Sequence, residues 1–111
     1  MFFRKSASSF KNLSVADYKA DFHDVKADHT LVDVRTPNEF KGGHLPGAIN
    51  IPLQQIGKRT DEIATDKPII LVCASGNRSK SAAKILSRAG RTDVYNINGG
   101  TMAWINQGFP T

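Results

Sequence analysis

The sequence predicts an α/β fold: a single domain with a mainly parallel central sheet and helices on both faces. Short apolar runs alternate along the chain with stretches that resemble helices. Such alternation is typical of parallel sheets, because a parallel connection needs a crossover long enough to hold a helix. The length of 111 residues, with 40% hydrophobic residues, suits one core of its own.

The expected domain covers residues 12–111 and follows a flexible segment, residues 1–11. Residues 1–10 are basic and serine-rich and lack the apolar stretch of a secretion signal, although their composition is also compatible with a transit peptide. No run approaches the ~18 apolar residues of a membrane span. The single cysteine excludes an intrachain disulfide, and a free thiol fits a reducing compartment, so we expect a cytoplasmic protein.

Serine and threonine caps mark two helix starts in the first half of the chain. Ser14 can accept a backbone N–H at the start of a helix that runs to about His23. The run Thr36-Pro37-Asn38-Glu39 is a capping box with proline at the first helical position, so a short helix should begin there and stop at Gly42-Gly43. Between these helices, the apolar run 30–34 predicts a buried strand.

Proline, glycine and apolar runs delimit the remaining elements. Pro52 should end a short strand, Gly57 weakens the helix that follows, and Gly90 should end a later helix. The expected elements are a turn at 45–47, a strand at 48–51, a helix within 54–64, a strand at 69–72, a helix at 79–89, a strand at 94–97 and a helix from Gly99-Gly100 up to Gly108.

Cys73 is the only cysteine, and it stands where a predicted strand meets a predicted helix. A strand end followed by a helix start aims backbone N–H groups and the positive end of the helix dipole at the sulfur. In the loop, Gly76 permits a left-handed bend, and Arg78 offers a forked donor suited to oxyanions. A lone thiol beside an apolar run also fits a structural cysteine. The combination favours a thiolate nucleophile that acts on an anionic substrate.

Residues from about 13 to 110 resemble the rhodanese family of sulfurtransferases. Three segments in the expected order carry this resemblance: residues 31–35 with 39–40 and 43–52, the loop 73–79, and residues 98–104 with 108–110. The resemblance implies that sulfane sulfur moves through a persulfide on Cys73. It also implies that the rest of this loop binds the substrate: Ala74, Ser75, Gly76, Asn77, Arg78 and Ser79.

Loop length separates two activities of this fold. Related dual-specificity phosphatases, like protein tyrosine phosphatases, use a Cys-x5-Arg loop whose cradle fits phosphate or arsenate, whereas only four residues separate Cys73 from Arg78. The tighter loop suits a single added sulfur atom. Ala74 stands where many thiosulfate-using members carry Arg or Lys, which leaves the donor open. The alternatives are a phosphatase or arsenate reductase, and a non-catalytic binding module or persulfide carrier.

Four polar residues are expected to support the site: Asp33, Arg35, Glu39 and His44. Arg35 and Glu39 are close enough in the predicted fold to form an ion pair, and Asp33 can accept loop N–H groups. His44 should hydrogen-bond the turn at 45–47. An acid–base site at the carboxylates, or a general base at His44, is the alternative. The thiolate needs neither, since dipoles and hydrogen bonds suffice to form it.

Charge and residue distribution narrow the expected partners. The net charge is +5, but the basic residues are scattered without a long block or interleaved aromatic residues, so a surface attractive to small anions is expected rather than a nucleic-acid site. The expected partners are a small anionic sulfur donor such as thiosulfate and a thiol or cyanide acceptor, which includes a thioredoxin-like or other acceptor protein. No association with a membrane is expected. The histidines are too dispersed for a metal site, and no cofactor is expected. Four large side chains are assigned to the core: Phe22, Phe40, Ile85 and Trp104.

Overall fold

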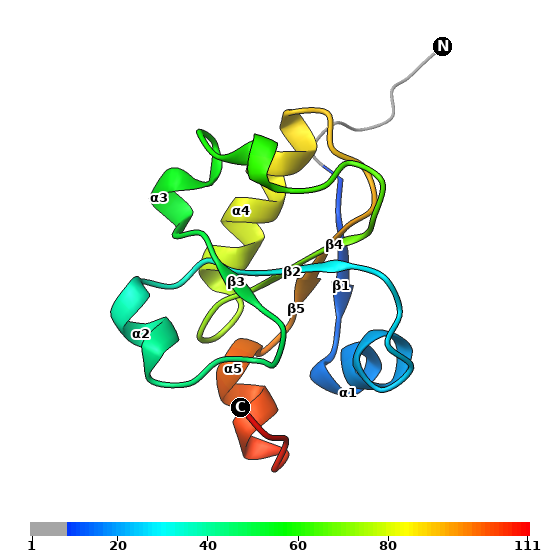
Figure 1. The fold of residues 1–111 in the computed structure, drawn as a ribbon, viewed down its shortest axis with the longest axis vertical. Coiled ribbons are helices and arrows are strands. Elements are labelled where there is room, and N and C mark those ends of the chain that lie inside the picture. Colours follow the sequence, from blue (N-terminus) through cyan, green and yellow to red (C-terminus); the bar gives the residue numbers. More distant parts are fainter. Residues whose placement is uncertain (1–8) are drawn as a thin grey trace.

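A computed structural model describes residues 9–111, and it shows a five-stranded sheet with helices on both faces (Figure 1). Every strand pair is parallel, in the order β1-β5-β4-β2-β3, so the predicted fold class is confirmed. The strands are β1 (Lys11–Leu13), β2 (Thr30–Asp33), β3 (Ile49–Asn50), β4 (Ile69–Val72) and β5 (Val94–Ile97).

The two helices for which the sequence shows capping signals begin at the expected residues. The Ser14 hydroxyl accepts the backbone N–H of Asp17, and both bonds of the Thr36–Glu39 capping box are present. The helix expected within 54–64 is interrupted after Gly57 and becomes two short pieces. The helices are α1 (Val15–Tyr18), its π-helical continuation η1 (Lys19–His23), α2 (Pro37–Lys41), α3 (Leu53–Ile56), the 3-10 turn η2 (Thr60–Glu62), α4 (Asn77–Arg88) and α5 (Gly100–Asn106).

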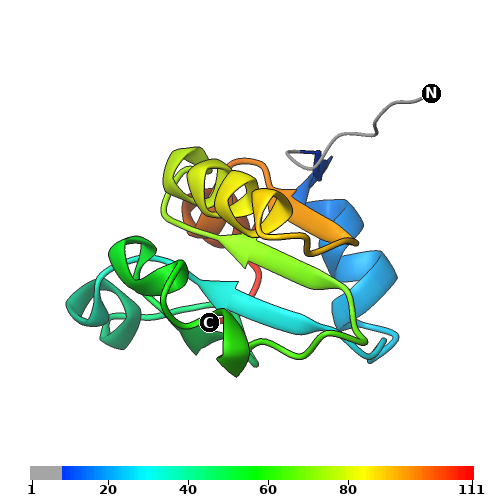
Figure 2. The ribbon, with the colours of Figure 1, turned by 90° about the horizontal axis from the view of Figure 1, so that it is seen from above.

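The central strands bury side chains on both faces of the sheet. In β4, Ile69 and Leu71 pack in a core with α3 and α4, whereas Ile70 and Val72 pack in a second core with α1 and α5. Figure 2 shows α3 and α4 on one side of the sheet and α1 on the other. Trp104 of α5 is fully buried, and its ring N–H donates to the carbonyl of Pro110 at 2.7 Å.

Two further features of the fold differ from the sequence analysis. Strand β1 was not predicted; it begins at Lys11, inside the segment expected to be flexible, and pairs with β5, while residues 1–8 of that segment lie outside the described residues. Ile85 was assigned to the core, but 37% of it is exposed because it lies on the outward face of α4. Within residues 9–111, no helix is long and apolar enough to cross a membrane.

Parallel pairing brings the carboxyl ends of β2, β4 and β5 to one edge of the sheet. The segments that follow them are the approach to α2, the loop that begins at Cys73, and the Asn98-Gly99 turn before α5. Open α/β sheets bind ligands at this edge, because the strand ends leave their loops facing a common space. Every residue of the candidate site lies in or beside these three segments.

Candidate active site

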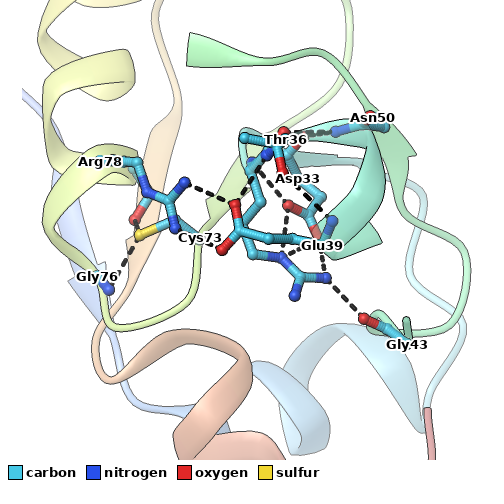
Figure 3. Close-up of polar contacts among 10 residues, drawn as sticks. Asp33, Thr36, Glu39, Gly43, Asn50, Cys73, Gly76 and Arg78 are labelled. Atoms are coloured by element: carbon cyan, nitrogen blue, oxygen red, sulfur yellow. Dashed lines mark hydrogen bonds and ion pairs between the residues drawn. The ribbon is translucent and has the colours of Figure 1, made fainter. Parts of the chain in front are cut away.

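Cys73 follows the last residue of β4 and is 1% exposed. The chain then bends sharply at Gly76, whose φ of +108° is readily available only to glycine, and α4 begins at Asn77. This bend turns the Gly76 N–H toward the sulfur, to which it donates at 3.0 Å (Figure 3). A Cβ atom at Gly76 would lie 3.3 Å from the backbone nitrogen of Gly99, so the neighbouring turn also restricts this position.

Hydrogen bonds around the sulfur oppose the effect of its burial. Burial by itself raises the pKa of the Cys73 thiol, because the interior disfavours the charged form. The Ser79 hydroxyl, 3.3 Å from Sγ, and the backbone N–H groups of Ser79, Gly76 and Ser75 act in the other direction. Their combined effect is larger, so the pKa of Cys73 lies below its ordinary value and the thiolate is favoured.

The first residues of α5 hold the back of the cysteine loop, a role that the sequence analysis did not assign. The N–H of Thr101 donates to the carbonyl of Cys73 at 2.8 Å, and the N–H of Met102 donates to that of Ala74 at 3.0 Å. Gly100 permits this approach: a Cβ atom there would lie 2.3 Å from the Cys73 carbonyl oxygen. With its carbonyls turned toward α5, the loop directs its N–H groups toward the sulfur. The signal in the sequence was the Gly99-Gly100 pair, interpreted only as a helix start.

Arg78 forms an ion pair with Glu39 of α2, with contacts of 2.8 and 3.0 Å between its two terminal nitrogens and the two carboxylate oxygens. Figure 3 shows the two side chains pointing toward each other beside Cys73. The bond from Arg78 lowers the pKa of Glu39 to about 2, and Glu39 in turn raises the pKa of Arg78. Each side chain is 36% exposed. The prediction that Glu39 pairs with Arg35 is therefore wrong.

Arg35 instead turns back onto Asp33, where its Nε and one terminal nitrogen contact the carboxylate at 2.8 to 3.0 Å. Residues two apart on an extended chain lie on the same face, which makes Asp33 the nearer partner. Asp33 is fully buried and, as expected, also accepts a backbone N–H, that of Arg35. Arg35 additionally donates to the Gly43 carbonyl at 2.7 Å, which connects the end of β2 to the segment after α2.

His44 contacts α2 rather than the turn at 45–47, which corrects the sequence analysis. Its ring lies flat on the Phe40 ring, with 3.7 Å between ring centroids, and its Nδ1–H donates to the Phe40 carbonyl at 2.8 Å. The carbonyls in the last turn of a helix lack partners within the helix, and this explains the preference. His44 therefore adds a second donor, besides the Gly43 N–H, to a carbonyl at the end of α2, the helix that carries Glu39.

Asn96 is the second functional residue that the sequence analysis missed. It lies in β5, is fully buried, and its Oδ1 accepts the hydroxyl of Ser79. Asparagine is depleted in strands, so its position within the run Val94–Ile97 was the available signal. Ser79 contacts both Asn96 and the sulfur, so its hydroxyl links Asn96 to Cys73.

The arrangement combines a nucleophile with groups that stabilise anions. A buried sulfur with a lowered pKa accepts hydrogen bonds from the loop, and the guanidinium of Arg78 stands beside it. The loop residues Ser75 and Asn77 are exposed and Ala74 is half-buried, and the loop lies at the edge of the sheet where open α/β sheets bind ligands. Among residues 9–111, no cluster of three or more His, Cys, Asp or Glu side chains is placed to hold a metal. Such a site can attack an electrophilic centre in an anionic substrate.

Comparisons with known proteins agree with this geometry. The family profile of the Rhodanese-like domain matches residues 14–107. Over 94 residues the chain is 45% identical to the uncharacterized protein YqhL of Bacillus subtilis, covering 85% of this chain and 71% of the relative. It is 36% identical to the thiosulfate sulfurtransferase GlpE of Shewanella oneidensis, covering 87% and 94%. A crystal structure of a rhodanese-related protein from Thermoplasma volcanium superimposes with a TM-score of 0.80 at 33% identity, covering 91% and 96%.

Proposed function

This chain belongs to the family of rhodanese-like domains, and we propose that it transfers sulfane sulfur from an anionic donor to a thiophilic acceptor through a persulfide on Cys73. The observation that carries the proposal is the sulfur of Cys73, which accepts a bond from the Gly76 N–H and lies 3.3 Å from the Ser79 hydroxyl, at the start of a 12-residue helix. The name of the S. oneidensis relative supports the class of reaction.

In the first step, the Cys73 thiolate attacks the outer sulfur of the donor, for which thiosulfate serves as the example. A new S–S bond forms at Cys73, and the old S–S bond breaks with its electron pair on the departing sulfite. The negative charge of the enzyme then resides on the outer sulfur of the persulfide. In the second step, an acceptor thiolate or cyanide attacks that outer sulfur, and Cys73 leaves as the thiolate. Each step exchanges one S–S or C–S bond for another, so no oxidant or reductant is consumed.

The loop supplies stabilisation in both steps. Backbone N–H groups of residues 74–79 bind the anionic sulfur, and the helix dipole of α4 acts in the same direction. Arg78 attracts the anionic donor and neutralises the departing oxyanion. Because Cys73 is 1% exposed, the donor must displace a neighbour to reach it. The half-exposed Arg78–Glu39 pair is the neighbour that can separate without disturbing the cores, and the donor replaces Glu39 as the anion at Arg78.

The proposal differs from its two alternatives in observable ways. A phosphatase or arsenate reductase needs the larger oxyanion cradle, whereas this loop has four residues between Cys73 and Arg78. A persulfide carrier would accept sulfur but pass it only to one partner protein, such as a thioredoxin-like acceptor. Since Cys73 must remain a free thiol, we also propose that the protein acts in a reducing compartment such as the cytoplasm.

The intact mass of the protein after incubation with thiosulfate tests the proposal. The wild-type chain should gain one sulfur atom, which cyanide or a thiol removes, with thiocyanate formed in repeated turnovers when cyanide is the acceptor. Cys73→Ser is the matched control, because it nearly preserves shape and should neither gain sulfur nor turn over. Single loading without turnover would indicate a carrier. Substantial thiosulfate:cyanide activity in a folded Cys73→Ser protein would overturn the mechanism.

A further inference from the structure

The hydroxyl of Ser79 faces two acceptors at once. Its oxygen lies 3.3 Å from the sulfur of Cys73 and 2.5 Å from Oδ1 of Asn96, and all three residues are buried. A serine hydroxyl carries one proton, so it can donate to only one of these acceptors at a time. The shorter contact assigns the proton to Asn96 as long as Cys73 carries no charge.

The orientation of the Asn96 amide agrees with its other contacts. Its Nδ2 group donates to Oδ1 of Asn12 and to Oδ1 of Asn98, each at 3.1 Å. A flipped amide would bring its oxygen against these two acceptors and its NH2 group toward Ser79. In this arrangement the Asn96 oxygen, which can only accept, faces the Ser79 hydroxyl.

From this geometry we propose that Asn96 is a positioning residue, which holds the hydroxyl proton of Ser79 and thereby sets how readily Cys73 ionises. When Cys73 is a thiol, the Ser79 proton bonds Asn96 and the serine oxygen is free to accept the S–H. When Cys73 is a thiolate, the charged sulfur is the stronger acceptor, and the proton must leave Asn96 to reach it. Ionisation therefore costs the Ser79–Asn96 bond. This inference deepens the proposed function, because it concerns the same nucleophile.

Few charged groups surround the sulfur, so the contribution of Asn96 can be measured. The loop itself carries Arg78, with Glu39 of α2 bound to it. The neighbouring strand β2 ends in Asp33, whose carboxylate is paired with Arg35. Strand β5 and helix α5 contain no charged residue. Because none of these charged groups contacts Asn96 or Ser79, a substitution of Asn96 leaves the charges in place.

The test is the pH dependence of alkylation of Cys73, the only cysteine in the chain, by iodoacetamide. Asn96→Leu removes the acceptor at similar size, releases the Ser79 proton to the thiolate, and should lower the alkylation midpoint by about half a pKa unit to one unit. Ser79→Ala should raise the midpoint. In the Ser79→Ala background, Asn96→Leu should cause no further shift, since its effect passes through the hydroxyl. This readout does not require sulfur transfer, so its failure is distinct from failure of the proposed function.

Asn12→Ala is the matched control, because it removes one bond of the same network and leaves the Ser79–Asn96 contact in place. Its midpoint should stay near that of the wild type. Asn96→Ala serves the same purpose as Asn96→Leu should leucine prevent folding. In the unmodified protein, the side-chain amide signals of Asn96 in NMR spectra should move with the Cys73 midpoint. An unchanged or raised midpoint in the Asn96 variants, an equal shift in both backgrounds, or amide signals that ignore the titration would overturn the proposal.

Discussion

Asp33 with Arg35 and Glu39 with Arg78 are both carboxylate–guanidinium pairs at the same edge of the sheet, but they differ in burial. The side chains of the first pair are 0% and 8% exposed, and the pair also binds backbone groups of Arg35 and Gly43. Those of the second pair are each 36% exposed. Removing one partner of a buried pair leaves an uncompensated charge, whereas an exposed partner is replaced by water or a ligand. The first pair therefore suits a structural role, and the second suits exchange with a substrate.

The largest effect is expected from Asp33→Ala. This change leaves the Arg35 guanidinium without its buried partner and should cost about 3–5 kcal/mol in the free energy of unfolding. Urea denaturation followed by circular dichroism measures it. The double variant Asp33→Ala/Arg35→Met should regain part of the lost free energy of unfolding, since it removes the unpaired buried guanidinium. A loss below ~1 kcal/mol in the single variant would contradict the structural role of this pair.

An intermediate effect, on activity rather than stability, is expected from Arg78→Ala. A charge-assisted contact to the donor is worth roughly 1.5–3 kcal/mol, so kcat/KM with thiosulfate should fall on the order of tenfold to a hundredfold. Transfer from an uncharged sulfane donor should fall less. Steady-state kinetics with both donors provide the measurement. Equal losses with both donors, together with lowered thermal stability, would mean that Arg78 only braces the loop against Glu39.

The smallest effect is expected from Glu39→Gln, which separates the two roles of Arg78. If Arg78 binds the donor, the loss of its competing carboxylate should leave kcat/KM for thiosulfate unchanged or higher. If Arg78 is only a brace, this variant should lose activity as Arg78→Ala does. Because the pair is exposed to solvent, the stability at pH 7 should fall by less than ~1 kcal/mol.

The pH dependence of stability provides a second readout of the exposed pair. The pKa of Glu39 is lowered to about 2 in the folded protein, so its contribution to stability is fully present above the ordinary glutamate pKa and is lost as the pH falls toward about 2. Between these limits, unfolding free energies of the wild type and Glu39→Gln should converge as the pH is lowered. A constant difference across this range would show that Glu39 does not contribute through its charge.

Local signals in the chain were sufficient for much of the fold and for the centre of the site. The cap at Ser14 and the capping box at Thr36 depend on groups three residues apart, and the structure contains both as expected. The apolar run before Cys73 and the glycine after it placed the thiol at a strand end ahead of a helix. Interactions of this kind depend on neighbours in the chain, so their geometry follows from residue type and spacing.

Three-residue strand β1 and the roles of Asn96 and Gly100 required the tertiary structure. Strand β1 is too short for a periodic pattern, and it is defined by its pairing with β5. Asn96 acts through Ser79 of α4, which precedes it by 17 residues, and Gly100 matters because α5 returns to the carbonyls behind Cys73. Each of these features depends on contacts between segments that are distant in the sequence and meet only when the chain folds.

The charged residues show the same division most clearly. Residue order alone places acids and bases that can pair at the end of β2 and the start of α2, and puts Arg78 in the loop that begins at the thiol. Folding selects the partners: Arg78 pairs with Glu39, which precedes it by 39 residues, and Arg35 pairs with Asp33. Attraction between opposite charges is not specific to one partner. The choice follows from which groups the packed elements bring within hydrogen-bond distance and which of them they shield from water.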